Sequence, residues 1–177
     1  MRIISGKHRG MKLVGFEGMD IRPTADRVKE SLFNILYGRI AGARVLDLFS
    51  GTGGVGIECL SRGAGTVHFN DVSAQSIAVL KSNLAKLKET NCTVTNLDYS
   101  SCLARGGVYD FIFIDPPYKS EAGLSALEII GKNKLLTIGG VAVYERDIPF
   151  TGNINGLKLV DERKYGKTYL TFFEAEL

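Results

Sequence analysis

The residues best suited to chemistry stand together at Asp115-Pro116-Pro117-Tyr118, directly after the apolar run Phe111–Ile114. Each proline fixes its own φ at about −65° and restrains the residue before it, which predicts a rigid shelf at the end of a buried strand. Neither proline has an N–H, so the carbonyl groups of Asp115 and Pro116 can accept hydrogen bonds. Such a shelf can hold a planar amino group by its two hydrogens while Tyr118 covers the ring. Taken alone, the four residues also fit a strand followed by a proline-stiffened turn.

A second motif lies upstream, where the apolar residues 45–48 lead into Gly51, Gly53 and Gly56 and then into a stretch with helical periodicity. A strand, a glycine loop and a helix in this order are typical of a site that binds a nucleotide-containing cofactor. Asp71, at the end of the next predicted strand, can accept hydrogen bonds from ribose hydroxyls. Alone, this loop fits NAD, FAD or S-adenosylmethionine equally well, and it also fits a tight turn that uses glycine for positive φ.

Together the two motifs resemble a class I S-adenosylmethionine-dependent methyltransferase of the kind that methylates amino groups. The segments 5–10 and 22–34 are similar to the RsmD group of bacterial 16S rRNA guanine-N2 methyltransferases. Asn83-Leu84 and Tyr165-Gly166 also fit that group, so the resemblance covers nearly the whole chain. One departure is visible, because the ribose-binding position, usually Glu in the family, is Asp71 here.

The resemblance implies direct in-line transfer of a methyl group from S-adenosylmethionine to the N2 amine of a splayed-out guanine in 16S rRNA. The partner would be the small ribosomal subunit or an assembly intermediate. The catalytic shelf would consist of Asp115, Pro116, Pro117 and Tyr118. The resemblance also implies a cofactor site formed by Asp47, Phe49, Gly51, Gly53, Gly56, Asp71 and Asp98. Read without the resemblance, Asp98 fits equally well an aspartate that caps a short turn.

The net charge of +3 is unevenly placed along the chain, since residues 1–44 hold nine Lys/Arg against four Asp/Glu and the remainder holds thirteen against fifteen. A basic patch beside a neutral catalytic region is the footprint expected for binding a phosphate backbone. A solvated edge strand, kept soluble by its lysines, explains the same charges without RNA. The candidate phosphate contacts are Arg2, Lys7, Arg9 and Lys12. To these the resemblance adds Arg22, Thr24 and Arg27 near the mouth of the active site, where a helix cap and surface charges are the alternative.

The pattern of apolar runs predicts one α/β domain spanning residues 1–177. Continuous apolar strands favour a parallel sheet with both faces covered. We expect a Rossmann-like core at 44–177 and a basic extension at 1–43, made of a small hairpin and a helix with Thr24 as its N-cap. The core should be a seven-stranded, mostly parallel, doubly wound sheet, and the resemblance implies its antiparallel C-terminal hairpin. The expected strands are 44–49, 66–71, 92–97, 109–114, 140–145, 157–164 and 168–175, and the expected helices are 54–62, 74–88 with Ser73 as its cap, and 121–132.

Composition excludes several classes of protein. No apolar run approaches the roughly 20 residues that span a bilayer, and the N-terminus lacks the apolar segment of a signal peptide, so we expect no membrane association. Three cysteines without a C-x-x-C pair and only two histidines argue against a metal site. A cytoplasmic monomer is the economical prediction.

Three other functions remain for comparison. A DNA adenine-N6 methyltransferase uses the same shelf chemistry, but such enzymes usually carry a sizeable target-recognition insertion, and no segment here is long enough for one. A nicotinamide-dependent oxidoreductase would need an acid/base for hydride transfer after the glycine loop, and neither His8 nor His68 is placed for that. A catalytically silent RNA-binding module fits poorly with an intact set of motifs.

Overall fold

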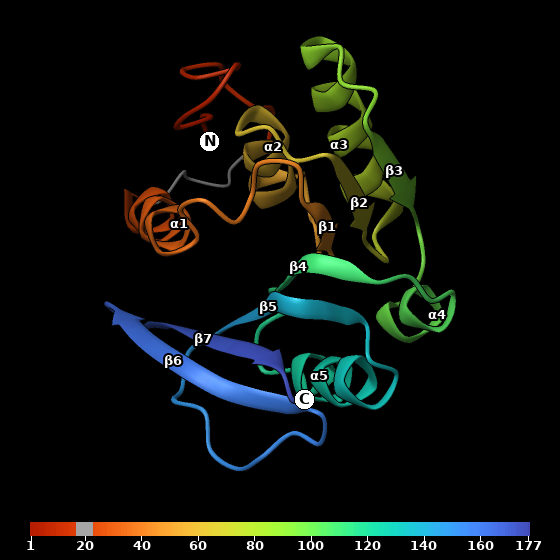
Figure 1. The fold of residues 1–177 in the computed structure, drawn as a ribbon. Helices are drawn as coiled ribbons and strands as arrows, with labels where there is room; N and C mark the ends of the chain where they lie inside the picture. The colour runs from red at the N-terminus through yellow and green to blue at the C-terminus, as the bar shows by residue number, and fades with distance from the viewer. Residues whose placement is uncertain (17–22) are drawn as a thin grey trace.

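The computed structural model describes residues 1–16 and 23–177, and a seven-stranded sheet runs through its middle (Figure 1). The strand order is β3-β2-β1-β4-β5-β7-β6, in which β1 to β5 are parallel and β7 is antiparallel to both of its neighbours. The strands are β1 (Arg44–Asp47), β2 (Thr66–Asn70), β3 (Cys92–Thr95), β4 (Tyr109–Ile114), β5 (Leu136–Arg146), β6 (Leu157–Tyr165) and β7 (Thr168–Ala175). The predicted sheet, with its antiparallel C-terminal hairpin, is confirmed.

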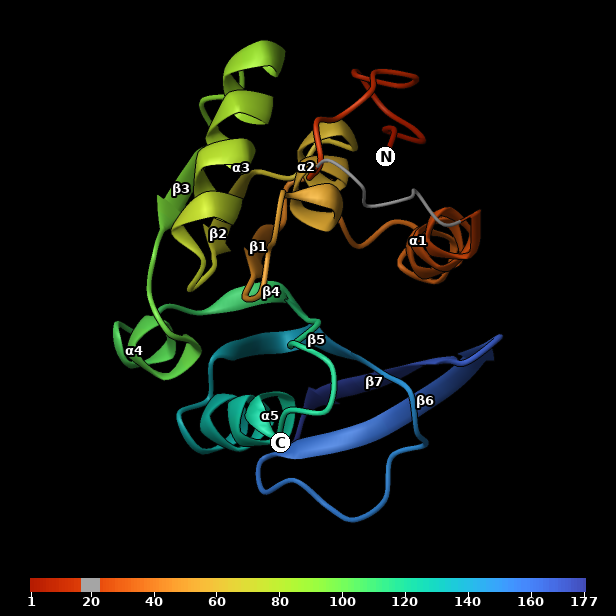
Figure 2. The ribbon, with the colours of Figure 1, turned by 180° about the vertical axis from the view of Figure 1, so that it is seen from behind.

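Helices cover both faces of this sheet, as the front and rear views show (Figures 1 and 2). On one face lie α1 (Pro23–Ile35), α2 (Gly54–Ser61) and α3 (Ala74–Leu87). On the other lie α4 (Tyr99–Ala104) and α5 (Ala122–Lys132).

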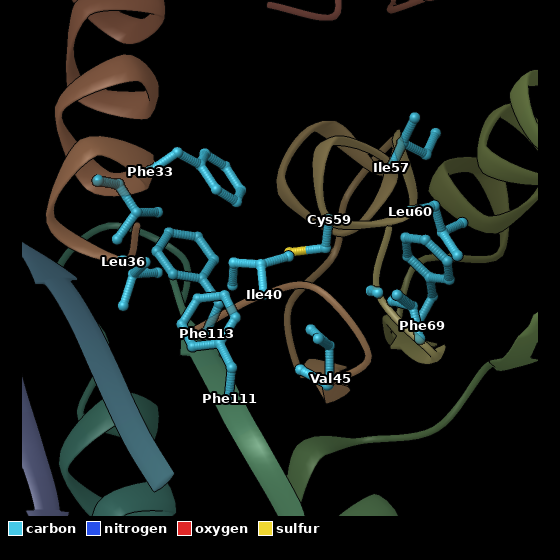
Figure 3. Close-up of a cluster of buried hydrophobic side chains, with 14 of the residues drawn as sticks. Phe33, Leu36, Ile40, Val45, Ile57, Cys59, Leu60, Phe69, Phe111 and Phe113 are labelled. Carbon is cyan, nitrogen blue, oxygen red and sulfur yellow. The ribbon is translucent and has the colours of Figure 1, made fainter. Parts of the chain in front are cut away.

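Successive residues of the central strands pack into opposite layers of the core, because side chains alternate across a strand. Val45 and Phe111 belong to the hydrophobic cluster under α1, α2 and α3, part of which is drawn in Figure 3. Their neighbours Leu46 and Ile112 belong to the cluster under α4 and α5. The side chains of the central strands are buried on both faces, which explains why their sequences read as continuous apolar runs.

The N-terminal segment (residues 1–14) packs on α2, but it forms less of a hairpin than its sequence predicts. A single antiparallel bridge joins Arg2 to Lys12. The fully buried carboxylate of Glu58 on α2 accepts hydrogen bonds from the backbone N–H groups of Ile4 at 2.9 Å and Ser5 at 3.0 Å. Long-range bonds to a buried carboxylate therefore anchor this segment. Its two halves share one bridge and not a regular two-stranded ladder.

The helix boundaries confirm one predicted cap, correct another and add a helix. Ser73 caps α3 by accepting a hydrogen bond from the N–H of Ser76. The N-cap prediction for Thr24 is wrong, because α1 begins at Pro23 and Thr24 therefore lies inside its first turn. Proline suits the first helical position because the missing N–H has no partner there in any case. The short α4 had not been predicted from the sequence.

Within residues 1–16 and 23–177, no helix combines the length and the apolar character needed to cross a bilayer. Over the same residues, no three His, Cys, Asp or Glu side chains come together in a way that could hold a metal ion. Cys59 is buried in the cluster under α2, and the half-buried Cys92 packs against the same cluster.

Candidate active site

The two sequence motifs meet where the strand order reverses. Strand β1, which leads into the glycine loop, pairs with β4, which leads into Asp115-Pro116-Pro117-Tyr118. In open α/β sheets, ligands bind in the crevice beyond the carboxyl ends of the strands at such a switch point. The fold therefore brings both candidate motifs to the position where a ligand is expected.

The glycine loop needs its glycines for two separate reasons. Gly53 stands at the N-cap of α2 with φ of 100°, in the left-handed region that favours glycine. At Gly56 an added Cβ would lie 2.2 Å from the ring of Phe69, so the helix and β2 could not pack as closely with any side chain there. Beside Gly51, by contrast, an added Cβ would meet no atom within 4 Å, which leaves open space at the turn of the loop.

Asp47 ends β1 and is the most deeply buried carboxylate among the candidate residues, with 2% of its surface exposed. One of its oxygens accepts a hydrogen bond of 2.9 Å from the backbone N–H of Gly56. Burial raises the pKa of Asp47 to about 7, and the negative charges of Asp115 and Asp71 raise it further against the lowering effect of the Gly56 bond. A neighbouring positive charge would relieve this repulsion, so the position suits a cationic ligand.

Asp71 follows β2 and lies half-buried next to the glycine loop. Its two carboxylate oxygens accept hydrogen bonds of 2.8 Å from the backbone N–H groups of Gly51 and Ser73. A carboxylate can accept about four hydrogen bonds, so acceptor capacity remains for a ribose. Asp71 thus shapes the loop whether or not a ligand is bound.

Asp98 acts as the N-cap of α4 in this structure. Its carboxylate accepts hydrogen bonds from the N–H of Ser101 and from the hydroxyls of Ser100 and Ser101, and these bonds lower its pKa. Nearby, the ring centroids of Phe49 and Tyr99 lie 5.8 Å apart. Two aromatic rings from the ends of β1 and α4 offer an apolar surface for a flat ring such as adenine.

Asp115 opens into a hollow of about 400 Å³, lined also by Pro116, Pro117 and Tyr118. The residue is exposed toward the hollow, yet the protein atoms around its carboxylate raise its pKa to about 7 by removing water from it. Tyr118 is 74% exposed, and hydrogen bonding to Asp147 together with the negative charge of that residue raises the pKa of Tyr118. An exposed aromatic ring beside a poorly solvated carboxylate is the arrangement that the shelf hypothesis requires.

The basic candidate residues at this end of the chain fall into two groups. Arg2 and Arg9 of the N-terminal segment and Arg27 of α1 line one hollow of about 470 Å³, which Asp26 and Glu30 also line. The ammonium group of Lys7 instead lies 2.7 Å from the Glu89 carboxylate, which already offsets its charge.

The remaining candidate residues contribute less to this picture. The side chain of Lys12 is exposed, while its carbonyl oxygen accepts a hydrogen bond of 2.9 Å from Lys86. Arg22 lies outside the described residues, and of Thr24 only its place in the backbone of α1 is described.

Comparison with known proteins identifies the family. The model of the family described as conserved hypothetical protein 95 matches residues 1–174. The chain belongs to this family, the RsmD family.

Several relatives of this RsmD-family chain are similar over most of their length. Ribosomal RNA small subunit methyltransferase D of Escherichia coli is 35% identical over 161 residues, which cover 90% of this chain and 79% of that protein. YlbH of Bacillus subtilis is 36% identical over 181 residues, or 98% of each chain. The solved structure of yhhF from Escherichia coli superposes with a TM-score of 0.90 at 32% identity, covering 99% of this chain and 98% of that one.

Three residues of this RsmD-family chain have structural roles that sequence reasoning missed. Glu58 anchors the N-terminal segment, and the fully buried Asn83 ties Val14 to Thr52 of the glycine loop through its side-chain amide. Glu145, at the end of β5, faces Asp115 closely enough for the charge of Asp115 to raise its pKa. A charged or amide residue inside an apolar helix stripe was the available signal for the first two. The third depends on strand pairing, which a single sequence does not reveal.

Proposed function

We propose that this chain methylates the exocyclic N2 amine of a guanine in 16S rRNA, with S-adenosylmethionine as the methyl donor. The observation that carries the proposal is the amine-holding shelf beginning at Asp115, which stands beside the glycine loop because β1 and β4 are neighbours in the sheet. The relatives named ribosomal RNA small subunit methyltransferase D support an rRNA substrate.

The groups around the glycine loop suit S-adenosylmethionine. This donor has no phosphate, and the loop offers open space at Gly51 where the backbone can be approached closely. Ser50 in the same loop has a buried hydroxyl that finds no hydrogen-bond partner among the described residues. When bound, S-adenosylmethionine supplies a methyl group already activated by its positively charged sulfur. Asp71 would accept hydrogen bonds from the ribose, and Asp47 would offset the positive charge of the donor.

Further residues would complete the donor site. Gly53 and Gly56 would keep the loop close to the ligand, and the rings of Phe49 and Tyr99 would hold the adenine. Asp98 would contribute through the backbone it fixes at the start of α4, because its side-chain oxygens already serve as the helix cap.

The chemistry at Asp115 follows from the weakness of the nucleophile. The N2 lone pair is delocalised into the purine ring, so the amine attacks poorly until its two hydrogens are held. The Asp115 carboxylate and the Pro116 carbonyl would accept those hydrogens and favour a pyramidal nitrogen whose lone pair points outward. As positive charge develops on N2, the carboxylate stabilises it in a poorly solvated site, where electrostatic effects are large. With a pKa of about 7, Asp115 can also receive the proton that N2 loses after methylation.

Access requires the guanine to leave its stack, because a base inside a helix cannot reach the shelf. Pro117 would stiffen the shelf, and the exposed ring of Tyr118 would take up the stacking that the base loses. Backbone phosphates would lie against the hollow lined by Arg2, Arg9 and Arg27. Lys7, Lys12, Arg22 and Thr24 are further proposed contacts to the RNA. We propose that residues 1–177 act as one domain, since Glu58 and Asn83 tie the extension to the catalytic core. We also propose that the protein acts as a monomer.

A deletion strain tests the proposal directly. Its 16S rRNA should lack one N2-methylguanine that the parent carries, detected by mass spectrometry of nuclease fragments. Purified protein and S-adenosylmethionine should restore that methyl group on free 16S rRNA, on assembly intermediates or on mature small subunits, and the most active particle identifies the natural substrate. Calorimetry should show binding of S-adenosylmethionine and none of NADH. An rRNA with an unchanged set of methyl groups would refute the proposal.

A further inference from the structure

Glu145 is a second carboxylate at the shelf, and the chemistry above gives it no role. In the β4–β5 pairing Ile114 stands opposite Tyr144, so Asp115 and Glu145 follow side by side at the carboxyl ends of the two strands. The residues two positions earlier, Phe113 and Val143, pack in the same cluster under α1 to α3. Because side chains alternate along a strand, both carboxylates leave the sheet on that face.

The hollow at the shelf contains polar groups that are not satisfied within the protein. Among the described residues, no hydrogen bond or ion pair engages the Glu145 carboxylate, and burial followed by the charge of Asp115 raises its pKa to about 8. Arg146 Nε and Ser120 Oγ line the same hollow and are buried without a partner among those residues. Buried polar groups are nearly always hydrogen-bonded, so these groups indicate a polar ligand.

Guanine is distinguished from the other amino-bearing bases by what stands next to its amine. Beside N2 lies the ring N1–H, which is a hydrogen-bond donor. Beside the adenine N6 and the cytosine N4 amines lies instead a ring nitrogen with a lone pair, which is an acceptor. An ionised carboxylate next to the shelf would bond the first edge, whose N1–H would itself favour the ionised form, and it would repel the other two.

Building on the proposed function, we propose that Glu145 selects guanine by accepting a hydrogen bond from the ring N1–H while Asp115 and Pro116 hold the adjacent amine. Glu145 is thus a specificity-determining residue that contacts the base. A site built to bond a donor discriminates strongly against an analogue lacking it, because the buried acceptor is then left unpaired. Discrimination comes from Glu145, and the readiness of the amine to react comes from Asp115.

The test replaces the target guanine, once mapped, by 2-aminopurine in a ligated RNA assembled into the particle that the protein methylates. This base keeps the 2-amino group but presents a lone pair at N1. Single-turnover rates per enzyme concentration for the two RNAs give a guanine preference, expected to be on the order of 10- to 100-fold, as for one charge-assisted hydrogen bond. Glu145→Gln should reduce this preference at least about tenfold, because the amide can turn its N–H toward the N1 lone pair.

Damage to the fold would slow the methylation of both RNAs alike. A change in the guanine preference therefore reports recognition of the base. Because 2-aminopurine also lacks O6, the change caused by the substitution decides the question, not the wild-type preference itself. Asp147→Asn serves as the matched control, since Asp147 lines the same hollow and faces the Tyr118 hydroxyl; its preference should equal that of the wild type. Equal preferences in wild type and Glu145→Gln would overturn the assignment of Glu145 while leaving the proposed function intact. A wild-type protein that methylates no guanine in either RNA would overturn the proposed function and, with it, this inference.

Discussion

Replacing Asp47 by Asn should stabilise the protein, and the gain should grow with pH. The pKa of Asp47 is raised from 3.8 to about 7 by burial. A folded pKa above the unfolded one means that the folded state binds the proton more tightly. The resulting stabilisation is complete below the unfolded pKa and is lost as pH rises through the folded pKa. Above pH 7 the buried charge therefore lowers the free energy of unfolding, and the amide removes that charge while still accepting the 2.9 Å bond from Gly56.

The size of the effect follows from the same shift. At about 1.4 kcal/mol per pKa unit, the full difference between wild type and Asp47→Asn is about 4 kcal/mol at pH 8. At pH 5, where only part of the shift is felt, the difference should be about 2 kcal/mol, and at pH 4 it should nearly vanish. Urea unfolding followed by circular dichroism at these three pH values measures it, with the denaturant slope checked for constancy.

A control of opposite sign is available on β4. Asp110 accepts hydrogen bonds of 2.8 Å from the Arg44 N–H and the Thr137 hydroxyl, and these bonds lower its pKa. Asp110→Asn should therefore destabilise the protein at neutral pH, and its effect should fade as pH falls. A pH-independent difference for Asp47→Asn, or a loss of stability at pH 8, would show that Asp47 is not a strained buried charge. The same variant should bind S-adenosylmethionine more weakly, because the charge that costs stability is the one proposed to face the donor.

Three further outcomes are expected. Asp115→Ala should lower the rate of methyl transfer on the order of 100- to 1000-fold with donor affinity nearly unchanged, measured by single-turnover kinetics and calorimetry. Asp71→Ala should raise the dissociation constant of the donor and also lower the melting temperature, because the Gly51 N–H loses its acceptor. Replacing three hollow-lining arginines by Gln should weaken RNA binding and flatten its salt dependence by roughly 0.7–0.9 per lost phosphate contact in log–log slope, whereas Lys7→Gln, already paired with Glu89, should have a smaller effect. The three arginines to be replaced together are Arg2, Arg9 and Arg27. Equal salt slopes in wild type and the triple variant would assign these arginines to a solvated surface only.

The parts of the site that sequence predicted are those in which a short segment fixes its own geometry. The prolines at 116 and 117 restrict the backbone locally, whatever the rest of the chain does. The glycines of the loop likewise indicate a turn before a helix. That the two motifs adjoin is a finding of the structure, in which β1 and β4 are paired and both motifs follow the carboxyl ends of their strands. The predicted sheet was right for the same reason, since apolar runs of strand length alternate with helices.

Sequence reasoning missed contacts between a side chain and a segment that is distant in the chain. One example is the ion pair of Lys7, a candidate RNA contact, with Glu89 just beyond the C-terminal end of α3, which no local pattern indicates. Glu58 had been given no role from the sequence, although its carboxylate accepts hydrogen bonds from the backbone of the N-terminal segment. The structure gives Asp98 the capping role that its sequence context had left open. Contacts of this kind depend on the tertiary arrangement, and only coordinates reveal them.

The alternation of side chains along three strands explains how the site acquires its charge. Asp47, Asp115 and Glu145 each stand two residues after a core residue that packs under α1 to α3, so all three carboxylates leave the sheet on one face. Burial raises the pKa of each, and the charge of Asp115 raises those of Asp47 and Glu145 further, so their ionised forms are destabilising until a cation or several N–H donors arrive. The proposed sulfonium donor and the hydrogens of a guanine edge would supply both. In the proposed function the acidic groups would serve the reacting groups and the arginines at the N-terminal hollow would serve the phosphates. The two roles can be tested separately because different elements carry these residues.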